Sequence, residues 1–280
     1  MSKWIISAFA DEHSRSLEGQ ICALKENDLD HIELRFIDGK NIADMTENQV
    51  SELKKTLDMN GIAVSAIGSP LGKINLADDF EAHLEKTRRV CHTANILGAD
   101  KIRIFSFYLH SGKSRKECRG EVTEKLGRML DIADGFGVKL CHENEANIYG
   151  ESPEYCLDLL EHFDGRLRAV FDMGNFVLDG CDPVKGYDML KPYIEYFHIK
   201  DALAQGAIVP AGCGDAHIEE LLHRFSRDSG KAVLLSIEPH LQTFDGLNAL
   251  VGKSFDNPYK FDSLKSAFNE AVKRTKELLL

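Results

Sequence analysis

Short runs of β-branched and aromatic residues alternate along the chain with longer segments whose apolar residues follow the helical period. Eight such runs are expected to form strands, at residues 4–10, 31–36, 62–68, 101–107, 138–143, 167–172, 193–200 and 233–238. Their starts lie roughly 26 to 40 residues apart, which is about the length of one strand–helix unit. The pattern therefore predicts repeated strand–helix units.

The segments between the runs have the spacing of amphipathic helices. Residues 80–94 and 122–136 place apolar side chains three, four or seven positions apart, and residues 261–280 predict a closing helix. Glycines that suit helix ends stand just before three of the strands, at Gly61, Gly98 and Gly137.

Eight strands alternating with eight helices predict a single α/β domain over residues 1–280, a (β/α)₈ TIM barrel with eight parallel strands. The main alternative is a doubly wound open sheet, which carries a glycine-rich phosphate turn after its first strand. The sequence ISAFADEHS at this place contains no GxGxxG, and GxxxxGK[ST] does not occur in the chain. The barrel is therefore favoured.

Composition narrows the class of protein. The net charge of −11 disfavours a nucleic-acid partner, because Lys and Arg neutralise phosphates in such complexes. No stretch approaches the ~18 apolar residues that a spanning helix needs, so no membrane partner is expected. The seven cysteines form no CxxC pair, which favours reduced thiols and a cytoplasmic protein without a thiolate zinc site.

Ionisable residues gather at the ends of four consecutive predicted strands. The fifth ends in His142-Glu143-Asn144-Glu145, the sixth in Asp172, the seventh in His198 and Lys200, and the eighth in Glu238 and His240. In a parallel barrel these ends lie on one face and the side chains converge, as in the active sites of TIM barrels. One strand-end carboxylate is well explained as a helix cap, but four such strands in a row are not.

Three carboxylates and an imidazole at one place repel one another unless a cation is present. We therefore predict one divalent metal ion per chain, with Mn²⁺ preferred and Mg²⁺, Co²⁺ or Zn²⁺ as alternatives, since the ligands are mostly hard oxygens. The predicted ligands are Glu143, Asp172, His198 and Glu238.

The chain resembles the xylose isomerase-like superfamily of sugar isomerases and epimerases over essentially all its length. The resemblance is carried, in order, by FADE, ELR, SPLGKI, KIRIFSFY, HENEANIYG, FDMGNF, YFHIKDA, GCGD and SIEPH. It implies the same four ligands at the ends of strands five to eight. Many relatives carry a histidine three residues after the strand-six Asp, whereas this chain has Asn175.

The resemblance implies a metal-dependent isomerase or epimerase that removes a proton next to a metal-chelated carbonyl. Glu143 and Glu238 are the predicted acid–base pair, and coordination through one oxygen would leave each a second oxygen free to act as a base. The residues predicted to contact substrate, a small carbohydrate, are Arg35, Lys73, Glu145, Asn175, Lys200 and His240. Glu33 and Arg35, two residues apart, are expected to form an internal ion pair.

Other activities remain open. A dehydratase acting on a sugar or an inositol-derived ketone starts with the same proton abstraction, and a sugar-binding barrel without turnover needs the same fold. A zinc-dependent apurinic endonuclease of this superfamily uses extra histidines after strands three, four and six, where this chain reads AIGSPLG, RIFSFYL and DMGN. A homodimer or homotetramer is expected, since barrel helices are exposed.

Overall fold

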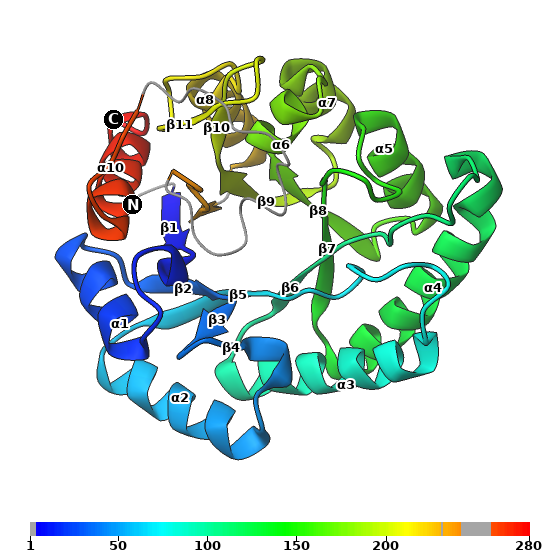
Figure 1. The fold of residues 1–280 in the computed structure, drawn as a ribbon, viewed down its shortest axis with the longest axis horizontal. Helices are drawn as coiled ribbons and strands as arrows, with labels where there is room; N and C mark the ends of the chain where they lie inside the picture. Colours follow the sequence, from blue (N-terminus) through cyan, green and yellow to red (C-terminus); the bar gives the residue numbers. More distant parts are fainter. Residues whose placement is uncertain (1–3, 231, 242–258) are drawn as a thin grey trace.

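The computed structural model describes residues 4–230, 232–241 and 259–280 of the chain. Eight parallel strands form one sheet in the order β1-β12-β9-β8-β7-β6-β5-β2, and β1 packs against β2, so the sheet is a nearly closed barrel (Figure 1). The fold predicted from the sequence is confirmed. The strands are β1 (Trp4–Ala8), β2 (His31–Leu34), β5 (Ala63–Gly68), β6 (Lys101–Ile104), β7 (Lys139–Glu143), β8 (Leu167–Asp172), β9 (Ile194–Ile199) and β12 (Val233–Ile237).

The helices surround the barrel (Figure 1). They are the 3₁₀ turns η1 (Ala10–Glu12) and η2 (Ile42–Asp44), and α1 (Leu17–Glu26), α2 (Glu47–Met59), α3 (Phe80–Leu97), α4 (Arg115–Phe136), α5 (Pro153–His162), α6 (Met173–Leu178), α7 (Pro183–Leu190), α8 (Ile218–Ser229) and α10 (Leu264–Glu277). Gly98 and Gly137 end α3 and α4 in the left-handed conformation, as predicted. A search of the described residues finds no helix that is both long and apolar enough to cross a membrane.

Some predicted boundaries are wrong at the ends that carry chemistry. The first strand stops at Ala8, because the next residues enter η1, and the fourth stops at Ile104 before the loop in which Phe107 has a φ of +67°. The second stops at Leu34, and Phe36–Ile37 (β3) forms a small hairpin with Lys40–Asn41 (β4). Similarly, β10 (Asp201–Ala202) pairs with β11 (Ile208–Val209) beyond β9. These departures turn the chain away from the sheet at the site's edge.

Alternate residues of the last four barrel strands place apolar and ionisable side chains on the same interior face. Cys141, Val170, Tyr196 and Leu234 belong to a small buried cluster, and two residues later on β7 and β8 come Glu143 and Asp172. Because side chains alternate across a strand, a step of two residues keeps the same face. His198 follows Tyr196 in the same way, so the apolar layer supports an ionisable one above it.

Candidate metal centre at the strand ends

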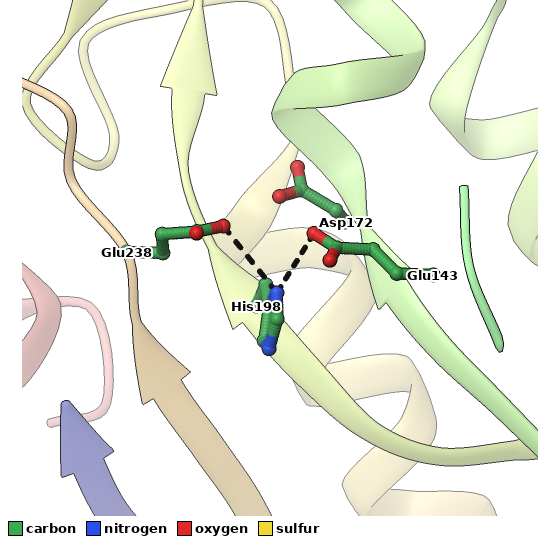
Figure 2. Close-up of side chains that lie close together, drawn as sticks. All are labelled: Glu143, Asp172, His198 and Glu238. Atoms are coloured by element: carbon green, nitrogen blue, oxygen red, sulfur yellow. Dashed lines mark hydrogen bonds and ion pairs between the residues drawn. The ribbon is translucent and has the colours of Figure 1, made fainter. Parts of the chain in front are cut away.

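Four buried side chains converge where β7, β8, β9 and β12 end. Glu143, Asp172, His198 and Glu238 each offer a ligand atom within 4.8 Å of the others, and each residue is at most 3% exposed. Glu143 and Glu238 approach His198 from opposite sides (Figure 2). Nδ1 of His198 lies 2.9 Å from Oε1 of Glu143 and 3.4 Å from Oε2 of Glu238. The convergence expected from the sequence is present.

The other oxygen of each glutamate is bound by an arginine. Arg103 Nη1 donates to Oε2 of Glu143 at 2.6 Å, and Arg35 Nη1 donates to Oε1 of Glu238 at 2.8 Å. Both guanidinium groups lie near the ring of Phe9, at 5.6 Å for Arg103 and 4.5 Å for Arg35. The second oxygens are therefore not free, which differs from the expectation for a carboxylate base.

His198 is held from its far side by Glu33. The Nε2 atom of His198 lies 3.2 and 3.3 Å from the two carboxylate oxygens of Glu33, and the hydroxyl of Tyr196 donates to Oε1 of Glu33 at 2.9 Å. A proton on Nε2 leaves the Nδ1 lone pair facing Glu143 and Glu238, which is the tautomer that a metal ligand needs. Among the described residues, the carboxylate of Glu33 contacts His198 and Tyr196 and does not pair with Arg35, so the expected ion pair between Glu33 and Arg35 is wrong. The ion pairs of Arg35 join it to Asp11, Glu12 and Glu238.

Asp172 is fixed by the start of α6 and by Lys200. Its Oδ1 accepts from the backbone N–H of Asn175 at 2.8 Å, so Asp172 also caps the helix, and its Oδ2 accepts from Lys200 Nζ at 3.0 Å. Lys200 Nζ also reaches Oδ1 of Asn175 and Oε2 of Glu238, at 3.0 and 3.1 Å. Asn144 exchanges hydrogen bonds with the backbone N–H and C=O of Asp172 and ties β7 to β8. Lys200 and Asn175 thus lie in the cluster, and their contact with substrate stays a prediction.

His240 lies at the β1 side of the cluster with Glu12. Its backbone N–H donates to Oε2 of Glu12 at 2.8 Å, and its Nε2 lies 3.3 Å from Oε1 of Glu12 and 3.5 Å from Oε1 of Glu238. Burial raises the pKa of Glu12 to about 8, although the charge of Arg35 opposes the shift. His240 therefore borders the site as the sequence suggested, and Glu12 joins it.

The buried charges shift one another's proton affinity strongly. Burial alone would raise the pKa of Glu143, but the charges of His198 and Arg103 hold it below its ordinary value. The pKa of Glu238 is likewise well below its ordinary value, because Lys200 and His240 outweigh the effect of burial. Asp172 goes the other way: burial raises its pKa to about 7 despite Lys200.

Lys73 and Glu145 pair with each other on the loops after β5 and β7. Lys73 Nζ donates to Oε2 of Glu145 at 2.8 Å, and both side chains are about one-fifth exposed. Lys73 Nζ also lies 4.2 Å from the centre of the Phe105 ring, and the guanidinium of Arg103 lies 4.6 Å from the centre of the same ring. These two predicted substrate residues are connected to the cluster through Phe105 and Arg103, and the charge of Glu145 also acts on Lys200.

A cavity of about 630 Å³ lies at the opposite end of the barrel, where the strands begin. Lys101, Lys139 and Arg168 line it, but Glu195 pairs with Lys139 at 2.6 Å and with Arg168 at 3.3 Å, and Asp100 pairs with Lys101 at 2.5 Å. These three cations are already paired, and the cavity is lined by none of the four converging side chains. The strand-end cluster remains the candidate site.

The site residues predicted from the sequence do not include several members of this cluster. Glu12, Glu33, Arg103 and Asn144 are each at most 7% exposed and bind members of the cluster directly or through one neighbour. The motifs FADE, ELR, KIRIFSFY and HENEANIYG contain them, but their partners lie far away along the sequence, on other strands.

Comparison with solved structures shows the same fold. A xylose isomerase-like TIM-barrel protein from Mycobacterium smegmatis, in complex with magnesium, has a TM-score of 0.72 at 18% identity, covering 100% of this chain and 98% of that one. The IOLI protein with a bound zinc atom has a TM-score of 0.76 at 16% identity, covering 98% and 97%. At these identities the likeness concerns the fold alone.

Among curated proteins, a 3-dehydroshikimate dehydratase from Bacillus anthracis is 26% identical over 182 residues. The match spans 63% of this chain and 63% of the length of that relative. The sequence model of a family described as xylose isomerase-like TIM barrel matches residues 21–254. The chain therefore belongs to the xylose isomerase-like TIM-barrel family.

Proposed function

We propose that the protein is an isomerase or epimerase of a small carbohydrate that depends on one divalent metal ion bound by Glu143, Asp172, His198 and Glu238. The observation that carries the proposal is the convergence of three buried carboxylates and one imidazole within 4.8 Å at the active-site end of the barrel. Oxygen ligands with a single nitrogen suit Mn²⁺, our first choice, as well as Mg²⁺, Co²⁺ and Zn²⁺.

The charge balance of the site supports a bound cation. Six carboxyl groups surround it, on Asp11, Glu12, Glu33, Glu143, Asp172 and Glu238. With Glu12 protonated, as its pKa of about 8 implies, five carboxylates remain against the permanent charges of three side chains, Arg35, Arg103 and Lys200. Buried charges are costly unless they are balanced. A divalent ion offsets most of the excess, and its donors are already oriented by Glu33 and the arginines.

When bound, the ion would polarise a substrate carbonyl and lower the cost of removing the neighbouring proton. Glu143 and Glu238 are the proposed acid–base pair, since they come from β7 and β12 and flank His198 on two sides. For either to take a proton, an oxygen now bound by Arg103 or Arg35 must exchange that contact for the proton.

Substrate contacts are proposed for the polar groups around the same centre. Lys200, Asn175, His240 and Arg35 border the glutamates and can exchange a protein contact for a substrate hydroxyl. Lys73 and Glu145 stand further out on their loops and are proposed to contact the distal end of the substrate.

A dehydratase is the second candidate, because the curated relative is named 3-dehydroshikimate dehydratase. Dehydration begins with the same abstraction next to a carbonyl and differs in the departure of a hydroxyl group. In this site Glu12 is a further carboxyl beside Glu238 and His240, and burial keeps its pKa at about 8, so it can donate a proton to a leaving hydroxyl.

Metal content per chain, measured by plasma mass spectrometry for wild type and Glu238→Gln, tests the proposal first. One divalent ion per chain, diminished in the variant, supports it; none after reconstitution rules out metal-assisted proton abstraction and leaves a sugar-binding barrel. Three zinc ions per chain would instead favour the nuclease alternative.

Incubation of the loaded protein with candidate sugars and keto acids in deuterium oxide then identifies the reaction. Deuterium at the carbon next to the carbonyl without loss of water indicates isomerisation or epimerisation, whereas loss of water indicates a dehydratase. Glu143→Gln serves as the matched inactive variant. Binding without exchange would contradict both enzymes.

We further propose that the chain acts as one domain and assembles as a homodimer or homotetramer in the cytoplasm. Light scattering after size exclusion measures the assembly directly, and a monomer would contradict that part of the proposal.

A further inference from the structure

We propose that Arg35 and Arg103 restrict Glu238 and Glu143 to one metal-facing oxygen each, and that this restriction makes the site select small six-coordinate divalent ions over Ca²⁺. The inference rests on the metal site of the proposed function. It assigns to the two arginines a positioning role that acts through the glutamates.

The four oxygens of the two glutamates are divided between opposite sides. In Glu143, Oε2 accepts from Arg103 at 2.6 Å while Oε1 faces Nδ1 of His198 at 2.9 Å. In Glu238, Oε1 accepts from Arg35 at 2.8 Å while Oε2 faces Nδ1 of His198 at 3.4 Å and Lys200 Nζ at 3.1 Å. One oxygen of each carboxylate therefore points to the centre, and the other points away from it.

The arginines that hold the outer oxygens are themselves immobilised. Asp11 binds Arg35 through both carboxylate oxygens, at 2.8 and 3.2 Å. Arg103 is 5% exposed and lies against the rings of Phe9 and Phe105. A Cβ placed on Gly68 would lie 2.4 Å from the Phe9 ring, so the backbone packs closely on that ring from β5.

The third carboxylate is restricted in the same way by a different device. Oδ1 of Asp172 caps α6 through the N–H of Asn175, which leaves Oδ2 as the oxygen on the Lys200 side. All three carboxylates thus have one oxygen that is tied to protein on the outer side.

The number of available oxygens bears on which ion fits. Ca²⁺ binds about six to eight oxygens and often takes both oxygens of a carboxylate, whereas Mg²⁺ and ions of similar size prefer six ligands in an octahedron. Freeing the outer oxygen of Glu143 or Glu238 would let that carboxylate bind through both oxygens. The expected result is a gain in Ca²⁺ affinity relative to Mn²⁺.

Calorimetric titration with MnCl₂ and CaCl₂, each alone and without substrate, tests the inference. Wild type is compared with Arg103→Met, Arg35→Met and the control Arg168→Met, which removes an arginine at the opposite end of the barrel. We expect the ratio of Ca²⁺ to Mn²⁺ affinity to rise about tenfold in the first two variants, the scale of effects from groups that orient ligands, and to stay unchanged in the control.

A purely structural role of the arginines predicts a different result. A general loosening of the site lowers the affinity for both ions and leaves the ratio of Ca²⁺ to Mn²⁺ affinity constant. That outcome overturns the inference. Arg103→Lys and Arg35→Lys are measured as well, since they keep the charge and can fold where the Met variants do not. A lysine lacks the guanidinium fork, so a smaller rise in the same direction is expected, and no rise overturns the inference.

Failure of the inference and failure of the proposed function are distinguishable. Wild type that binds neither ion contradicts the metal site itself. Wild type that binds Mn²⁺, with variants of unchanged ion preference, leaves the metal site standing and contradicts only the role of the arginines.

Discussion

The imidazole of His198 is engaged on both of its nitrogens, which makes its orientation a property of its neighbours. Nδ1 faces Glu143 and Glu238, and Nε2 faces Glu33, which in turn accepts from Tyr196. In this arrangement the pKa of His198 is well above its ordinary value, because Glu143 and Glu33 outweigh the burial that opposes it. A divalent ion would replace that proton on Nδ1, while Glu33 keeps the one on Nε2.

Glu33→Gln is therefore expected to weaken Mn²⁺ binding by about 10- to 100-fold, since the amide no longer fixes the tautomer of His198 through a charged partner. Calorimetric titration with MnCl₂ measures the effect. Tyr196→Phe is the control: it removes the hydroxyl that donates to Glu33 but leaves the contact of Glu33 with His198, so a much smaller loss is expected. Equal affinity in Glu33→Gln and wild type would show that Glu33 does not position the ligand.

Strand periodicity in the sequence predicted the four converging residues, but it did not predict which residues of other strands bind them. Glu143, Asp172, His198 and Glu238 all stand at strand ends on the interior face, which a period of two residues reveals. The contacts of Arg103 with Glu143 and of Arg35 with Glu238 join residues 40 and 203 positions apart. Such pairings depend on how the strands are arranged in space, which the sequence does not show directly. On the sequence alone, Glu33 is therefore paired with Arg35, its near neighbour along the chain, and this pairing is wrong.

The loops after β5 and β6 are joined by backbone hydrogen bonds next to Lys73. The backbone N–H groups of Phe105 and Phe107 donate to the carbonyls of Leu71 and Gly72, at 2.8 and 2.9 Å. Gly72 approaches so closely that a Cβ on it would lie 2.0 Å from the carbonyl oxygen of Phe105. A side chain at this position would push the two loops apart.

Gly72→Ala should consequently destabilise the protein by about 2 kcal/mol more than Gly112→Ala, because the first creates a backbone clash and the second does not. The two glycines have similar positive φ values, +83° and +76°, so the strain of the left-handed conformation is common to both variants. Urea denaturation of both variants measures the difference. Equal losses would mean that the loops can separate without penalty.

His83 on α3 ties the same loop to the helix and makes its stability depend on pH. Its Nε2 accepts from the N–H of Gly72 at 3.0 Å, and burial, with Lys86 and Lys125 nearby, lowers the pKa of His83 to about 4. Because the folded pKa is below the unfolded one, the unfolded chain binds the proton first as pH falls. Stability is full above about pH 6.5 and is lost between there and about pH 4.

Because His83 stays neutral in the folded protein, we expect it to lower the free energy of unfolding by about 2 kcal/mol between about pH 7 and pH 5. His83→Gln is the matched variant, since a glutamine oxygen can accept from Gly72 but does not titrate. Urea denaturation at both pH values is expected to give a smaller loss for the variant than for wild type. Parallel losses in the two proteins would assign the pH dependence to other groups.

The order of helices and strands could be predicted where the apolar period and the helix-capping residues agree. The boundaries of elements could not be predicted where a strand runs into a buried loop. Helices α3 and α4 end at the predicted glycines, whereas two helices, α6 and α7, stand between β8 and β9 in place of one. Asp172 and Asp182 each cap one of these helices, and Pro183 begins the second, so the division into two helices could have been predicted from the sequence. The early ends of β1 and β6 could not be predicted in this way, because apolar residues continue past both ends into buried loops.

For the molecule as a whole, the excess of carboxylates at the site links metal binding to folding. The site draws its side chains from both halves of the chain, with Asp11, Glu12, Glu33 and Arg35 from the first strands and Glu238 from the last. Without a cation, folding must bring these carboxylates together in a buried place at an electrostatic cost. With one bound, the same convergence stabilises the closed barrel, because the unfolded chain does not present the ligands together.

Mn²⁺ at about a hundred times its dissociation constant should stabilise the folded protein by about 3 kcal/mol, which corresponds to a rise in Tm of about 5–10 °C for a chain of this size. Differential scanning calorimetry with EDTA and with excess MnCl₂ measures the shift. Glu238→Gln lacks one ligand and should show a much smaller rise; its Tm in EDTA is expected to be below that of wild type, because the amide loses the buried ion pairs of Glu238 with Arg35 and Lys200. An equal rise in both proteins would place the stabilising ion elsewhere, and no rise in wild type would contradict a link between this site and folding.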